Sequence, residues 1–107
     1  MKQEVTKELQ DDYDYLVGIM SQVVQKTPQE VKTSRLYPLP ICRGMVFKLL
    51  LKYGYMYREV SAVSGLVLSS ITHAINQFKH AQANPTQKRV QDTYNEFNTK
   101  LKENGKF

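Results

Sequence analysis

The chain of 107 residues has the length of one small domain. Apolar residues make up 41% and charged residues 23%, a balance typical of globular proteins that excludes disordered and collagen-like chains. The longest apolar runs are far too short to span a bilayer and no signal-peptide pattern precedes them, so we expect no membrane partner and a cytoplasmic location. The single cysteine, Cys42, cannot form an internal disulfide, which fits a reducing compartment.

The net charge of +5 is concentrated in the middle of the sequence. Residues 35–89 carry eight basic residues against Glu59 alone, a net charge of +7, whereas residues 1–34 have −2 and residues 90–107 are balanced. A basic block between acidic or neutral flanks indicates a surface that binds a polyanion. A solvated, lysine-rich surface would give the same pattern, so charge alone does not decide between them.

The first part of the chain predicts a long helix followed by a short one. Residues 3–26 form the long helix, with Gly18 as a weak position inside it. Its apolar stripe recurs every three or four residues and consists of Val5, Leu9, Tyr13, Leu16, Met20 and Val23. The short helix starts at Thr27-Pro28-Gln29-Glu30, where Thr27 can cap and Glu30 can complete a capping box. Pro38 and Pro40 prevent its continuation.

Four further helices are predicted downstream. They span residues 41–53, 57–64, 69 to about 83, and 86–103. The expected core residues are Met45, Val46, Leu49, Leu50 and Tyr53, then Val60 and Val63, then Ile71, Ala74, Ile75 and Phe78, and finally Val90, Tyr94, Phe97 and Leu101. No stretch shows sustained alternation of apolar and polar residues between turns. We therefore expect one all-α domain over residues 1–107.

Residues 57–80 have the organisation of a helix-turn-helix, with Gly65 in the turn. Hydrogen-bonding side chains lie away from the core stripe of its second helix: Ser69, Thr72, His73, Asn76, Gln77 and His80. Such side chains can bond phosphate oxygens or base edges, and either Ser69 or Ser70 could also cap the helix. An ordinary helical hairpin with a polar face remains the alternative.

From Met20 to His80 the chain resembles the C-terminal DNA-binding domain of the bacterial replication initiator DnaA. The similarity lies in Thr33-Ser34-Arg35, which resembles the basic loop of that family, and in Arg43 eight residues later. Glu59-Val60 resembles its Glu-Ile, and residues 69–74 resemble its Ser/Thr-Thr-Val-x-His-Ala signature. The resemblance implies duplex DNA as partner, a nucleoid-associated location and a regulatory role in replication or transcription.

The chain departs from that family at the residues that read bases. Leu66-Val67-Leu68 stand where the family has Arg-Asp-His, and Ser61 replaces a glycine. The ATPase domain of the family and its P-loop have no counterpart in these 107 residues. We therefore expect weak preference for the box sequence of the initiator. Leu or Val at these positions can only meet a thymine methyl group or fill core space.

The resemblance assigns a role to Arg35, and spacing along a helix indicates one for Arg43, Lys48 and Lys52, for which a solubilising face remains the alternative. Arg35 would enter the minor groove, since Arg favours narrow grooves of high negative potential. Arg43, Lys48 and Lys52 recur along one side of a helix and, with Arg58, would hold phosphates. The full set of expected DNA-binding residues is Arg35, Arg43, Lys48, Lys52, Arg58, Ser69, Ser70, Thr72, His73, Asn76 and Gln77.

Other functions have less support in the sequence. We expect no catalytic residues, no metal, no cofactor and no small-molecule substrate, because Cys42 sits beside an apolar helix face and His73 and His80 lie too far apart for a metal pair. Tyr53, Tyr55 and Tyr57 are expected to pack around the Gly54 turn. The rival hypothesis is a protein-interaction module, in which the N-terminal helix or the patch Leu66-Val67-Leu68 binds a partner or a second copy.

Overall fold

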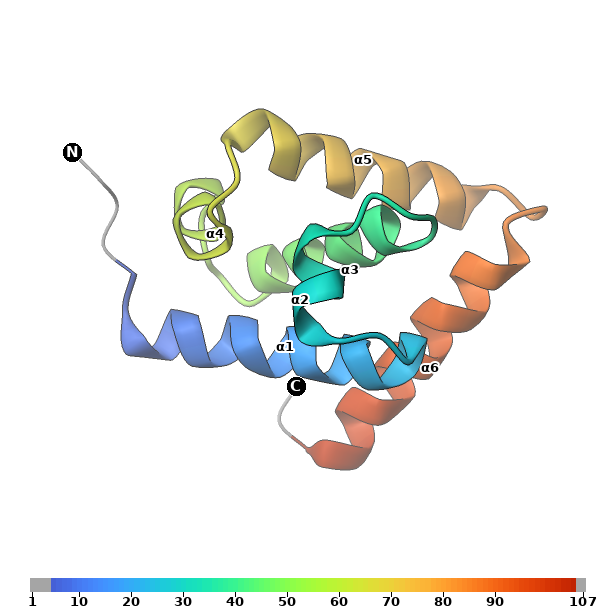
Figure 1. The fold of residues 1–107 in the computed structure, drawn as a ribbon, viewed down its shortest axis with the longest axis horizontal. Coiled ribbons are helices and arrows are strands. Elements are labelled where there is room, and N and C mark those ends of the chain that lie inside the picture. Colours follow the sequence, from blue (N-terminus) through green and yellow to red (C-terminus); the bar gives the residue numbers. More distant parts are fainter. Residues whose placement is uncertain (1–4, 106–107) are drawn as a thin grey trace.

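The computed structural model describes residues 5–105, and its regular elements over that range are helices, which confirms the all-α prediction. Figure 1 shows how they are arranged. The six helices are α1 (Lys7–Val24), α2 (Pro28–Thr33), α3 (Leu39–Lys52), α4 (Tyr57–Ser64), α5 (Leu68–Ala83) and α6 (Lys88–Asn104).

Helix α3 forms the centre of the fold. It contacts α1, α2, α4, α5 and α6, and Figure 1 shows it between α1 on one side and α5 on the other. Its side chains supply much of the core, since Cys42, Phe47 and Leu50 are at most 1% exposed. The expected core face of α5 is also confirmed, because Ile71, Ala74, Ile75 and Phe78 are all buried. In α6, Val90, Phe97 and Leu101 are buried as expected, and Tyr94 is partly buried.

Local capping decides where α1 and α2 begin. The Thr6 hydroxyl accepts from the Leu9 N–H at 3.2 Å, so α1 begins at Lys7 and not at residue 3, which lies outside the described residues. In α2 the predicted capping box is present. The Glu30 N–H donates to Thr27 Oγ1 at 3.1 Å, and the Thr27 N–H donates to Glu30 Oε1 at 3.2 Å. These bonds lower the pKa of Glu30 by stabilising its carboxylate.

Three further predicted helix starts were wrong, and one of them is that of α6, which begins at Lys88 and not at residue 86. Helix α3 begins at Leu39 because Pro40 is accommodated in the first turn, where a backbone N–H has no partner within the helix. Helix α5 begins at Leu68, and its N-cap residue is Val67, with no side-chain cap. Ser69 and Ser70 therefore do not cap α5, contrary to the prediction.

The tyrosines after α3 do not pack as expected. Tyr53 and Tyr57 are each 45% exposed. Tyr55 alone packs against the core, and its hydroxyl donates to a carboxylate oxygen of Asp12 at 2.6 Å. This bond ties the α3–α4 connection to α1, and together with burial it raises the pKa of Tyr55.

Helices α3 and α5 pack very closely at Gly44. A Cβ atom added to this glycine would lie 2.2 Å from the Ala74 carbonyl oxygen and 3.0 Å from the Phe78 Cβ. Only a residue without a side chain permits this approach. The contact places the first half of α5 beside the segment that joins α2 to α3. Within residues 5–105, none of the helices is both long and apolar enough to cross a membrane.

Candidate nucleic-acid interface

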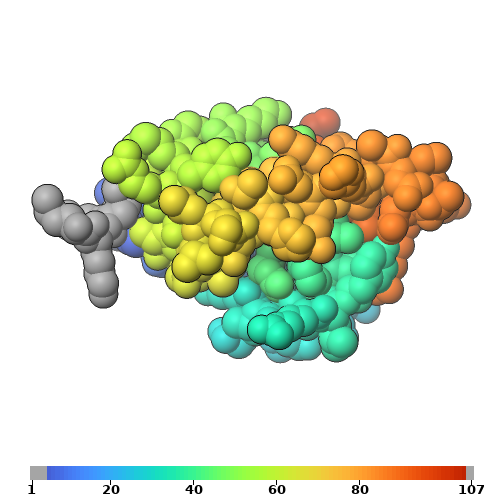
Figure 2. All heavy atoms as spheres, turned by 90° about the horizontal axis from the view of Figure 1, so that it is seen from above, coloured from blue at the N-terminus to red at the C-terminus, as the bar shows by residue number. Residues whose placement is uncertain are grey.

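A groove of about 890 Å³ lies between α5 and the segment that connects α2 to α3. Figure 2 shows this face of the molecule hollowed between the yellow-to-orange α5 and the cyan-green α2–α3 segment. We call it the basic groove. Its lining consists of Lys32, Thr33, Arg35, Pro40, Arg43, Leu66, Ser69, Ser70, His73, Ala74 and Gln77.

The charges in the basic groove are of one sign. Among residues 5–105, three cations line it and no carboxylate does. The Lys32 ammonium lies 3.6 Å from Asp14 Oδ1 and 5.3 Å from the centre of the Tyr13 ring, so this cation is already partly neutralised. Arg35 is exposed at the edge of the groove. It is therefore the residue best placed to offer an uncompensated charge to a ligand.

Arg43 has a different role from the one expected. It is half-buried, and its Nη1 donates to the carbonyl oxygens of Val31 at 3.0 Å and Ser34 at 2.7 Å. Burial also lowers its pKa because the charged form loses solvation. The two bonds hold the end of α2 against α3 and so fix the segment that carries Arg35. The structure thus corrects the predicted phosphate contact to a positioning role.

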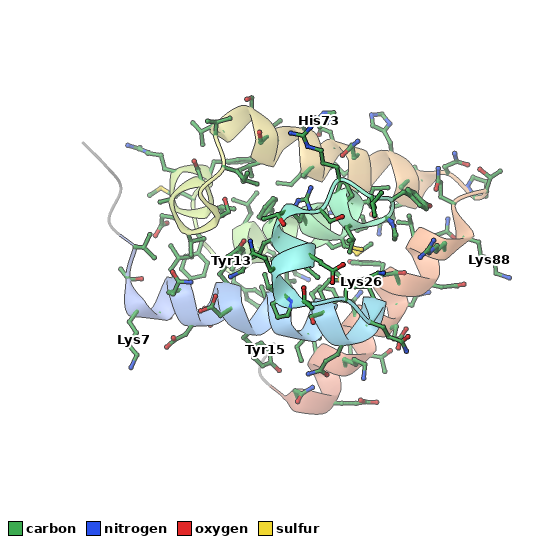
Figure 3. All side chains as sticks on the ribbon, in the orientation of Figure 1. Lys7, Tyr13, Tyr15, Lys26, His73 and Lys88 are labelled. Carbon is green, nitrogen blue, oxygen red and sulfur yellow. The ribbon has the colours of Figure 1, made fainter. Side chains whose placement is uncertain are left out.

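Helix α5 presents one face to the basic groove. Ser70, His73 and Gln77 recur at spacings of three and four, which places them on one side of the helix, and Ser69 joins them near its start. Figure 3 labels His73 on this helix, across from α1. Thr72 and Asn76 are exposed on α5 but lie outside the groove lining. Hydroxyl, imidazole and amide groups of this kind can bond phosphate oxygens or base edges.

Lys48 and Lys52 lie elsewhere, which is a second correction. They line a separate pocket of about 310 Å³ with residues of α5 and α6, where the Lys48 ammonium lies 5.4 Å from the centre of the Phe78 ring. The prediction placed them on the same side of the helix as Arg43. Arg43 and Lys52 are nine positions apart, which is about two and a half helical turns. Their side chains therefore point to opposite sides of α3. Arg58 is exposed on α4, outside the basic groove.

The sequence reasoning missed Lys32 and Thr33, which line the groove at the end of α2. The sequence did contain a signal for these two residues, because they lie close to Arg35 in the chain. The last turn of a short helix lies beside the loop that follows it. Five of the expected DNA-binding residues therefore line the basic groove together: Arg35, Ser69, Ser70, His73 and Gln77. Arg43 also lines it and holds the segment that carries Arg35 in place.

The described residues offer no cluster of metal ligands. No group of three or more His, Cys, Asp or Glu side chains within residues 5–105 could hold a metal ion. Cys42 is fully buried, and burial raises the pKa of its thiol to about 11. A thiol in that environment stays protonated at neutral pH and is a poor nucleophile.

Comparison of the chain with protein-family models, with curated proteins and with solved structures gave no match.

Proposed function

We propose that the protein binds duplex DNA through the basic groove and the outer face of α5. The observation that carries the proposal is the convergence of Arg35 with the hydrogen-bonding face of α5 in a groove that, in the part of the chain the structure describes, is lined by cations and by no carboxylate. Apart from Lys32 and Thr33, the residues that line this groove belong to the block of residues 35–89, which has a net charge of +7. A one-sign concave surface of this kind favours a polyanion.

In the proposed mode of binding, α4 and α5 act as a helix-turn-helix. The second helix enters the major groove, with Thr72 and Asn76 near base edges. One sugar–phosphate strand runs along the basic groove, where Ser69 and Ser70 donate to phosphate oxygens. The uncapped start of α5 adds backbone N–H donors and a favourable dipole. Arg35 reaches the minor groove on the far side of that strand.

The proposed biological role comes from the resemblance to the replication initiator. It is the regulation of replication or transcription on chromosomal or mobile DNA in a bacterial nucleoid. Residues 69–74, which carry the signature-like sequence Ser-Ser-Ile-Thr-His-Ala, lie at the start of α5 and contribute four residues to the basic groove.

The direct test is fluorescence anisotropy of a labelled mixed-sequence duplex at increasing salt. If Lys32 and Arg35 each neutralise one phosphate, log affinity falls linearly with log salt, with a slope of about −1.8. A flat response, or no binding at low salt, contradicts the proposal. In that case the exposed apolar residues Val67 and Leu68 would favour the rival, a protein-interaction module.

A charge-matched pair of variants locates the interface. Arg35→Ala should weaken binding to every duplex and reduce the magnitude of the salt slope by roughly one, because one phosphate contact is lost. Lys52→Ala removes the same charge from an exposed side chain that lines the other pocket, so it should leave the slope unchanged. Equal effects of the two substitutions would mean that the basic groove is not the interface.

The positioning role of Arg43 makes a separate prediction. Arg43→Met breaks both bonds to the α2 carbonyls, so it should cost about 1–3 kcal/mol of stability. DNA binding should weaken by roughly tenfold, or about 1.4 kcal/mol, as the Arg35 segment loses its support. The salt slope should stay as in the parent protein, because Arg43 itself releases no counterion. A slope reduced by about one would instead assign Arg43 to a phosphate.

A further inference from the structure

Two large apolar side chains are exposed at the start of α5. Val67 is 66% exposed and Leu68 is 48% exposed, whereas Leu66 is partly buried and packs against the core. The sequence left two uses for these residues, which were core packing and contact with a thymine methyl group. Their exposure removes core packing for Val67 and Leu68.

The turn before α5 holds these two side chains outward. Gly65 closes α4 with a φ of +75°, a conformation that other residues rarely adopt. The Ser61 hydroxyl donates to the Leu66 carbonyl oxygen at 2.5 Å, and the Leu66 N–H donates to Ser64 Oγ at 3.3 Å. These two bonds fix the backbone of Leu66 at both its carbonyl and its N–H. The conformation of the turn therefore keeps the side chains of Val67 and Leu68 exposed.

These exposed residues adjoin the basic groove. Ser69 and Ser70, which follow directly in the chain, line it, and so does Leu66. A phosphate strand in the groove therefore brings base pairs close to the start of α5, the part of a recognition helix that contacts base edges. The C5-methyl group of thymine is the one apolar feature that the major groove presents to a Val or Leu side chain.

We propose that Val67 and Leu68 contact thymine methyl groups and give the protein a preference for thymine-bearing duplexes. The inference rests on the proposed function, because it needs α5 in the major groove. In the initiator family, charged side chains at this end of the helix recognise the bases. In this protein, the apolar side chains of Val67 and Leu68 would do so instead.

The test compares a mixed-sequence duplex with the same duplex in which every thymidine is replaced by deoxyuridine. This change removes only the methyl groups. Burial of one methyl group corresponds to roughly a fourfold change in affinity, so the loss of two contacts should weaken binding by roughly fifteenfold. The double variant Val67→Ser/Leu68→Ser should bind both duplexes with equal affinity. Its melting temperature should stay within a few degrees of the parent, because both side chains are exposed.

Met56→Ser is the matched control. Met56 is 55% exposed and precedes the start of α4, away from the basic groove, so this variant should keep the discrimination of the parent protein. Equal binding of both duplexes by the parent overturns the inference and leaves the proposed function standing. Discrimination that persists in the double variant also overturns it, because other residues would then read the methyl groups. Absence of binding to either duplex overturns the proposed function itself.

Discussion

Gly44→Ala should destabilise the protein by about 2–3 kcal/mol, although alanine is the better helix former. The added Cβ would lie 2.2 Å from the Ala74 carbonyl oxygen, which is a backbone atom and cannot rotate away. Helices α3 and α5 must therefore separate, and the basic groove changes shape with them. Urea denaturation followed by circular dichroism measures the loss, and DNA titration should show weaker binding in the same variant.

Gly18→Ala is the control for that substitution. Gly18 lies within α1, and a Cβ at this position would meet nothing within 4 Å. Replacing a glycine in a helix interior with alanine then stabilises by about 0.5–1 kcal/mol. The two substitutions are chemically identical and should shift stability in opposite directions. A gain in stability at both positions would show that α3 and α5 do not approach as closely as described.

Phe78→Ala should cost about 3–5 kcal/mol, a large part of the stability of a domain this small. Phe78 is 0% exposed, and its ring centroid lies 5.0 Å from that of Tyr94 on α6 at an interplanar angle of 53°. The same ring lies 5.4 Å from the Lys48 ammonium on α3. The side chain therefore joins three helices, and its truncation leaves a cavity among them.

His73→Ala on the same helix separates stability from binding. His73 is exposed, so its loss should change the free energy of unfolding by no more than about 0.5 kcal/mol. DNA affinity should nevertheless fall by about 1–3 kcal/mol, since a phosphate or base-edge hydrogen bond is lost. Urea denaturation and DNA titration of both variants give the comparison. A stable His73→Ala variant with unchanged affinity would remove this residue from the interface.

The helices could be read from the sequence because their signals are local. The apolar spacing in residues 71–78 depends only on the helical repeat, and the capping box of Thr27 and Glu30 depends on residues three apart. Helix boundaries were less predictable. The start of α5 moved to Leu68 because the anchored turn ends at Leu66, and that turn depends on Ser61 and Ser64 in the preceding helix.

The candidate site was predictable in part. The polar face of α5 and the basic character of the middle of the chain both follow from spacing and composition, and so does the choice of His73 and Gln77. Arg35 was chosen because of the resemblance to the initiator family. The grouping of Lys48 and Lys52 with Arg43 was wrong. All three were read as one phosphate-binding side, whereas the helical repeat and the packing of α6 place the two lysines in another pocket.

By itself, the sequence determined the buried faces of α5 and α6, because the 3.6-residue repeat is a property of the local backbone. In α3 it did not indicate the buried Phe47, and it wrongly placed the exposed Tyr53 in the core. It also determined that the positive charge gathers in residues 35–89. Only the tertiary structure decided which charges share a surface. Arg43 turned inward to two carbonyl groups, and Gly44 let α5 approach α3 closely enough to form one wall of the basic groove. Both depend on contacts between residues far apart in the chain, which spacing along one helix does not encode.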